Sequence, residues 1–116
     1  MRSAKIAVPT NDGILIFPKM LGMAKEMYIY KIINNKHFEL IEIRANPYEH
    51  TMQHLKTLDV YDLINDCSAI ISAHIGKKGI TRLEEKGMKL FFKKGNIEEA
   101  LTDVIKGRES KNSDNS

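Results

Sequence analysis

The chain has 116 residues, of which 42% are hydrophobic and 28% are charged, so its composition is that of one ordinary globular domain. It excludes a fibrous repeat, and no apolar run approaches the roughly 20 residues that a membrane-spanning helix needs. The formal net charge is only +3 and the lysines are scattered among nearly as many carboxylates, which disfavours a nucleic acid as a partner. The single cysteine excludes an intrachain disulfide, and we expect a cytoplasmic protein with no membrane partner.

Short strands and turns are predicted at the start of the chain. Residues 4–8 form an apolar run that is closed by the turn-forming residues 9–13, and residues 14–17 read as a second short strand. Residues 18–25, with the sequence PKMLGMAK, have no clean period. They are therefore predicted to form a loop or a single helical turn.

An antiparallel hairpin is predicted next. Residues 28–33 and 37–44 are rich in β-branched and aromatic side chains, and Asn34, Asn35 and Lys36 between them are a turn signal. In the second run the apolar side chains do not alternate cleanly with the polar ones. The pattern therefore predicts a strand without fixing which of its faces is buried.

The second half of the chain alternates helical and strand patterns. Apolar residues recur at helical spacing after Pro47, and SAIISA at residues 68–73 is a continuous apolar run, typical of a strand buried on both faces. The further elements are a helix at residues 78–86 with Gly87 as its stop, a strand at 88–92, and a helix at 97–105 bounded by Asn96 and Gly107.

Together these patterns predict an α/β domain. The first half gives antiparallel strands, and the alternation in the second half is the signature of parallel strands joined by helices. We expect one domain at residues 1–107 and a disordered polar tail at 108–116. The expected core positions of the parallel half are Ile70, Ile71, Leu83 and Leu101.

The order of several short signatures resembles the dinitrogenase iron-molybdenum cofactor biosynthesis family. The matching pieces are KIAVPTNDG at residues 5–13, LGMAKEMYIY at 21–30, the pair Asn46 and Pro47, residues 66–90, and NIEEAL at 96–101. The resemblance implies a ribonuclease H-like fold with a mixed five-stranded sheet and about three helices. It also implies non-covalent binding or carriage of a metal-sulfur cluster or its precursor, without catalytic turnover by the domain.

One loop departs from the family pattern. Members that handle such clusters often carry His-Phe-Gly-Arg-Ala, and here the sequence is Met20, Leu21, Gly22, Met23, Ala24. Gly22 and Ala24 match the motif, whereas Met20 stands in place of its histidine and Met23 in place of its arginine. We retain Met20, Gly22 and Ala24 as candidate ligand-binding residues, with Met20 as a candidate metal contact.

The turn after the SAIISA strand is the second candidate segment. Ligands of open α/β sheets bind at the carboxyl ends of parallel strands, and the start of the following helix offers free N–H groups to an anion. The candidate residues there are His74, Gly76, Lys77, Lys78 and Gly79, with His74 as a candidate metal contact. The alternative is that a turn with glycines serves chain reversal alone.

Other residues are weaker candidates for metal binding. His50 and His54 would share one face of a helix that already began at His50, although the pair lacks the glutamate of a zinc-protease motif. The methionines clustered around Met23 could bind Cu(I) or fill gaps in the core. Cys67 precedes a buried strand and is expected to be a core residue.

The sequence as a whole favours a binding protein over an enzyme. It contains no nucleophile elbow and no phosphate-binding lysine loop, and Asp12 is the one carboxylate near the first strand, which disfavours a nuclease. The leading hypothesis is a non-catalytic carrier of a small anionic ligand or a molybdenum- or iron-containing sulfur cluster. The alternative is a protein-interaction or regulatory domain that keeps the fold and has lost the cluster site.

Overall fold

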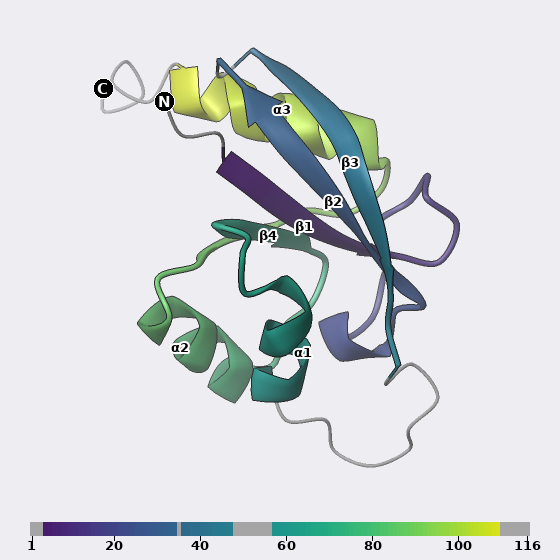
Figure 1. The fold of residues 1–116 in the computed structure, drawn as a ribbon, viewed down its shortest axis with the longest axis vertical. Coiled ribbons are helices and arrows are strands. Elements are labelled where there is room, and N and C mark those ends of the chain that lie inside the picture. Colours follow the sequence, from purple (N-terminus) through teal and green to yellow (C-terminus); the bar gives the residue numbers. More distant parts are fainter. Residues whose placement is uncertain (1–3, 35, 48–56, 110–116) are drawn as a thin grey trace.

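In the computed structural model, which describes residues 4–34, 36–47 and 57–109, five strands form one mixed sheet in the order β3-β2-β1-β4-β5 (Figure 1). The strands are β1 (Ala4–Thr10), β2 (Glu26–Ile33), β3 (His37–Ala45), β4 (Ala69–Ser72) and β5 (Lys89–Phe92). β1, β2 and β3 pair antiparallel, whereas β1, β4 and β5 run parallel. The predicted antiparallel first half and parallel second half are both confirmed.

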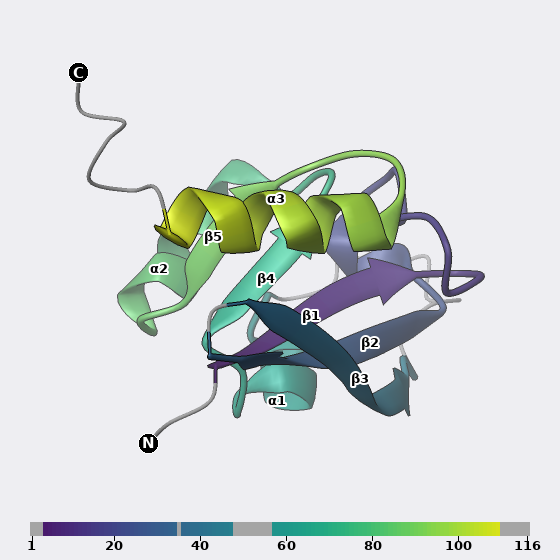
Figure 2. The same ribbon diagram turned by 90° about the horizontal axis from the view of Figure 1, so that it is seen from above.

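Helices cover both faces of the sheet. α1 (Thr57–Ile64) and α2 (Lys77–Glu85) pack on one face, and α3 (Ile97–Glu109) packs on the other (Figure 2). Within the described residues, none of these helices has the length and apolar character needed to span a bilayer.

The core is therefore divided into two layers by the sheet. The four predicted core positions, Ile70, Ile71, Leu83 and Leu101, are all fully buried. Ile70 and Leu83 lie on the α1/α2 side, and Ile71 and Leu101 lie on the α3 side. Ala69, Ile70 and Ile71 are apolar in succession because successive side chains of β4 enter opposite layers, both of which exclude water.

β1 is longer than predicted and contains a proline. It continues through Pro9 to Thr10, where the sequence predicted a turn. A central strand normally excludes proline because the missing N–H would break a ladder. Here β4 pairs with β1 only at Ile6 and Ala7, so no neighbour on that side requires an N–H from Pro9.

The predicted strand at residues 14–17 is wrong. In this segment only Leu15 forms an isolated bridge, with Asn96. The backbone N–H groups of Ile14 and Leu15 donate to Asp12 Oδ1 at 2.8 and 2.9 Å, so this carboxylate holds them in a turn. Asn and Asp side chains that accept such local bonds compete with strand pairing.

The helix ends differ in their agreement with the sequence. Gly87, with φ of 86°, follows the end of α2 as expected, whereas α3 continues through Gly107 to Glu109. A glycine inside a helix costs only about 1 kcal/mol, which packing of the apolar face of α3 offsets. The helix start before Thr57, the His50 and His54 pair and residues 110–116 lie outside the described residues.

A β-bulge explains the uneven pattern of the second hairpin strand. The pairing of β2 with β3 shifts by one residue between Ile29 and Tyr30, which pair with Glu42 and Leu40 respectively, so Ile41 is the extra residue. Because the bulge reverses the alternation, Leu40 and Ile43 face the same side of the sheet although they are three residues apart.

Candidate functional site

The two predicted candidate segments lie side by side at the carboxyl ends of the parallel strands. One follows β1 and contains the 3-10 helix η1 (Leu21–Met23), and the other follows β4. Met20 and His74 form an isolated parallel bridge, and the N–H of Leu21 donates to the His74 carbonyl at 3.1 Å. The backbone therefore holds the methionine-bearing loop against the turn that leads into α2.

A buried asparagine holds the η1 loop in shape. Asn46 Nδ2 donates to the carbonyls of Gly22 and Ala24 at 2.9 and 2.7 Å, and the N–H of Asn46 donates to the Lys25 carbonyl at 3.0 Å. Asn46 and Ala24 are buried, so these bonds satisfy polar groups that water does not reach. Sequence reasoning missed this role of Asn46, although the Asn-Pro pair at 46–47 was one of the quoted signatures.

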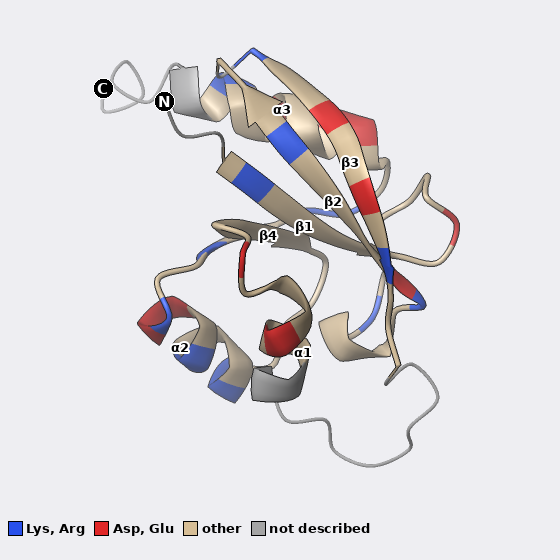
Figure 3. Ribbon diagram, in the orientation of Figure 1, with Lys and Arg blue, Asp and Glu red and all other residues tan. Residues whose placement is uncertain are grey.

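The start of α2 is open to an anion. Gly76 occupies its N-cap position without a side-chain hydrogen bond, and the first turn carries no acidic residue. Lys77 and Lys78 are exposed there, whereas Gly79 is buried. Figure 3 shows α2 with basic residues at its start and acidic residues at its end. Free N–H groups and positive charge therefore coincide at this helix end.

Met20 lies directly over this helix start. A Cβ added at Gly76 would approach the Met20 Cε to 3.2 Å, which is tighter than most real contacts of a Cβ. Glycine at position 76 therefore leaves room for the methionine side chain. Met20, Met23 and His74 are all exposed, whereas Met27 is fully buried and serves the core.

The donors at this turn are the Met20 thioether and the His74 imidazole. These groups suit soft or borderline metals rather than Mg²⁺ or Ca²⁺. The Cys67 thiol takes no part, because burial raises its pKa to about 12 and keeps it protonated. His37 lies exposed at the start of β3, at the far end of the hairpin.

The carboxylate that could have suggested a nuclease has a structural role. Backbone N–H groups of Leu15 and Ile14 lower the pKa of Asp12, which thus acts as an ionised acceptor for its own turn. In the part of the chain that the structure describes, no group of three or more His, Cys, Asp or Glu residues could hold a metal ion.

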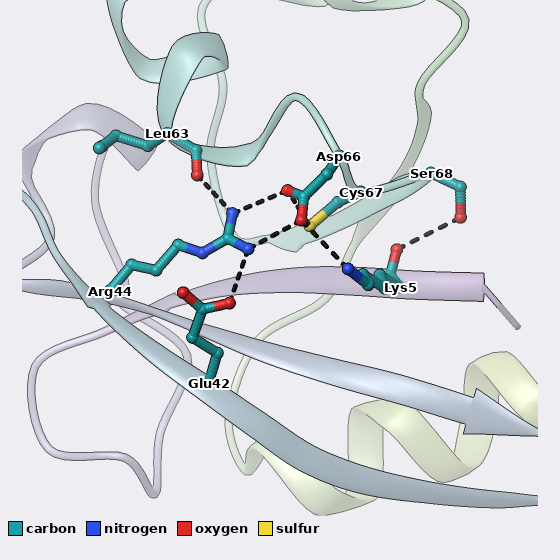
Figure 4. Close-up of polar contacts among 7 residues, drawn as sticks. All are labelled: Lys5, Glu42, Arg44, Leu63, Asp66, Cys67 and Ser68. Atoms are coloured by element: carbon teal, nitrogen blue, oxygen red, sulfur yellow. Dashed lines mark hydrogen bonds and ion pairs between the residues drawn. The ribbon is translucent and has the colours of Figure 1, made fainter.

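A second polar cluster joins β3 to the segment between α1 and β4. Arg44 donates from both terminal nitrogens to the Asp66 carboxylate at 2.8 Å, and also bonds Glu42 and the Leu63 carbonyl (Figure 4). Lys5 reaches Asp66 at 3.2 Å. The charges balance within the cluster, so its geometry indicates a clamp between elements rather than a ligand site.

This clamp predicts a pH dependence of stability. Hydrogen bonds from Arg44, and then from Lys5, hold the pKa of the Asp66 carboxyl below its usual value. The ionised carboxylate therefore stabilises the fold above the unfolded pKa of about 3.9, and this stabilisation is lost as the pH falls below that value. We expect Asp66→Asn to lower the free energy of unfolding by about 1 kcal/mol at neutral pH, since the side chains of Asp66 and Arg44 are 39% and 19% exposed.

The measurement is urea denaturation of both proteins over a series of pH values. The difference between them should shrink as the pH approaches 2, whereas Asp103→Asn, at an exposed position on α3, should show little difference at any pH. A difference for Asp66→Asn that stays constant down to pH 2 would contradict the electrostatic role.

Residues 2–107 match the sequence profile of the family described as dinitrogenase iron-molybdenum cofactor. Three solved structures are similar in fold. PH0822 has 16% identity and a TM-score of 0.72, covering 89% of this chain and 90% of that one. A Methanocaldococcus jannaschii protein provisionally assigned as a dinitrogenase has 16% identity and a TM-score of 0.64, with 92% of each chain covered. A Thermotoga protein provisionally assigned as NifB has 19% identity and a TM-score of 0.65, with 90% of each covered. No curated protein matches the chain.

Proposed function

Since this chain belongs to the dinitrogenase iron-molybdenum cofactor family, we propose that it binds or carries an anionic metal-sulfur cluster, or a precursor of one, without catalysing a reaction itself. The observation that carries the proposal is the bridge between Met20 and His74. It lies beside the uncapped, basic start of α2 and carries one soft thioether and one borderline imidazole. A sulfur-rich metalate carries negative charge and contains a metal that binds soft ligands. The basic helix start matches the charge, and the Met20 thioether matches the metal.

The proposed ligand contacts come from both segments. They are Met20, Gly22, Ala24, His74, Gly76, Lys77, Lys78 and Gly79, with Met20 and His74 as the metal contacts. Met20 Sδ and a His74 ring nitrogen would coordinate a metal of the cluster, while Lys77 and Lys78 would balance charge. The glycines allow the backbone to approach closely.

The proposal that the domain is non-catalytic rests on how its reactive groups are used. The Cys67 thiol is kept protonated by burial, and Asp12 accepts hydrogen bonds from its own turn. A carrier needs charge complementarity and exchange of its cargo, both of which an open surface site supplies. We further propose that the protein works in the cytoplasm, where a lone reduced cysteine is stable.

Titration with tetrathiomolybdate, followed by backbone amide NMR, tests the site. We expect the largest shifts at residues 73–79 and a second group at 18–24. Replacing both Lys77 and Lys78 by Gln should weaken binding about 2- to 30-fold, because each exposed charge is worth about 0.2 to 1 kcal/mol. The matched control is Lys31→Gln with Lys36→Gln, which removes the same charge at the opposite end of β2.

Two outcomes would contradict this site. Shifts centred on residues 50–55 would move the metal contact to the His50 and His54 pair. If no backbone amide resonance shifted at millimolar tetrathiomolybdate, the chain would not be a carrier of this kind of anion.

The second candidate function is a protein-interaction or regulatory domain of the same fold. The exposed Met20 and Met23, at positions where the family motif has histidine and arginine, favour it. Methionine is an adaptable side chain that is common on protein-binding surfaces. Metal and sulfide analysis of protein purified without oxygen separates the two functions, since only a carrier should retain molybdenum, iron or copper with sulfide.

A further inference from the structure

β3 presents an open edge with exposed apolar side chains. Among the described residues β3 has a strand partner on one side only, because it ends the order β3-β2-β1-β4-β5. Leu40, Ile41 and Ile43 are 42%, 41% and 49% exposed. A nine-residue edge strand of this kind offers unpaired backbone groups to another strand (Figure 2).

The bulge at Ile41 gives this edge an unusual symmetry. Through their β2 partners, Leu40 and Ile43 belong to the α3 face of the sheet. Glu39 and Glu42 pair with Lys31 and Ile29, and so belong to the α1/α2 face. The alternation of faces is therefore the same in both directions outward from the Ile41–Glu42 peptide bond, from Leu40 to Phe38 and from Ile43 to Ala45.

We propose that β3 pairs antiparallel with β3 of a second copy of this chain, about a two-fold axis through the Ile41–Glu42 peptide. In this register Leu40 lies opposite Ile43 of the second copy, and the pair occurs twice. Directly opposed residues of an antiparallel pair must share a face, and this register satisfies that condition at Phe38, Glu39 and Leu40, which lie opposite Ala45, Arg44 and Ile43 of the second copy. The two five-stranded sheets become one continuous sheet.

Neighbouring registers fail on the same condition. A two-fold axis through Ile41 sets Leu40 opposite Glu42 of the second copy, on different faces of the sheet. An axis through Glu42 opposes two like charges, Glu42 against its own copy, which is destabilising. In a strand without a bulge, opposed residues share a face only when the two-fold axis passes through a residue. The bulge at Ile41 moves this condition to an axis through the Ile41–Glu42 peptide.

Charge complementarity supports the same pairing. Glu39 lies opposite Arg44 of the second copy, and its neighbour on the other side is Lys31 of its own β2. A row of alternating charges therefore crosses the joined sheet on the α1/α2 face. The terminal nitrogens of Arg44 already donate to four acceptors of its own chain, so Glu39 of the second copy contributes charge attraction and does not replace these bonds.

The symmetry also limits growth of the assembly. Each chain has one β3, and a two-fold axis uses both copies, so the assembly closes as a dimer. A single-strand contact is small, and we expect a dimer that forms in the micromolar to millimolar range.

Sedimentation equilibrium of the full chain measures the dimer dissociation constant, and variants at the opposed positions Leu40 and Ile43 test the proposed register. Leu40→Lys and Ile43→Glu, each alone, set a charge against an apolar side chain and should raise the dimer dissociation constant at least tenfold. Leu40→Lys with Ile43→Glu in one chain sets Lys against Glu at both pairs, and dimerisation should return. Mixing the two single variants should give a heterodimer for the same reason.

The matched control is Phe92→Lys on β5, the edge strand at the other end of the sheet, where Phe92 is 50% exposed. This variant should dimerise as the parent chain does. Amide NMR spectra confirm that each variant is folded. A parent chain that stays monomeric at millimolar concentration overturns the proposal, as do single variants that dimerise normally or a double variant that stays monomeric.

Discussion

Replacing Leu101 by Ala is expected to lower the free energy of unfolding by about 2 to 5 kcal/mol. Leu101 is fully buried on α3 and packs in the layer that contains Ile71 and Val8. The smaller side chain leaves a cavity that the surrounding β1 and β4 side chains can fill only in part. Small domains are stable by only about 5 to 15 kcal/mol, so this change removes a large share of the total.

Urea denaturation of the variant and the parent measures this loss. Leu15→Ala is the matched control, because it makes the same chemical change at a side chain that is 50% exposed. It should lower the free energy of unfolding by well under half as much. If the two variants lost the same free energy of unfolding, α3 would not cover the core layer on its side of the sheet as described.

Replacing Asn46 by Ala is expected to lower the free energy of unfolding by about 1 to 3 kcal/mol and to loosen the η1 loop. The substitution leaves the buried Ala24 carbonyl and the part-buried Gly22 carbonyl without their donor, and an unsatisfied buried polar group is destabilising by about this amount. The loop carries Met20, so binding of tetrathiomolybdate should weaken as well.

Asn11→Ala is the matched control for the same loop. The Asn11 Oδ1 accepts one bond, from the Lys25 N–H at 2.7 Å, at an exposed position where water can replace it. Its loss should be below about 1 kcal/mol. If both variants lost the same stability and Asn46→Ala kept its affinity, Asn46 would not be the residue that shapes the loop.

The parallel half of the fold could be predicted because its signals are local. SAIISA contains the successive apolar residues Ala69, Ile70 and Ile71, and Gly87 has the positive φ that a helix terminus favours. The errors arose where local and tertiary signals compete. Residues 14–17 are as apolar as a strand, yet Asp12 takes the N–H groups that a ladder would need. Gly107 is a weak helix former, yet packing of α3 on the sheet carries the helix past it.

The candidate site was predictable in part for the same reason. A turn with glycines after a buried strand marks the start of α2, and the family signatures include the Met20 loop. The contact between them could not be read from spacing, because 54 residues separate Met20 from His74. The role of Asn46 could not be read from spacing either, since its bonds to Gly22 and Ala24 depend on the pairing of β3 with β2. The bulge at Ile41 is visible in the sequence only as a broken alternation.

The rate at which the buried Cys67 is alkylated can measure how often the fold opens. Alkylating reagents attack the thiolate, and burial keeps this thiol protonated at the pH of ordinary labelling reactions. The folded chain should therefore react only as fast as the segment between α1 and β4 opens. Because the sequence contains one cysteine, a single added mass reports each such event.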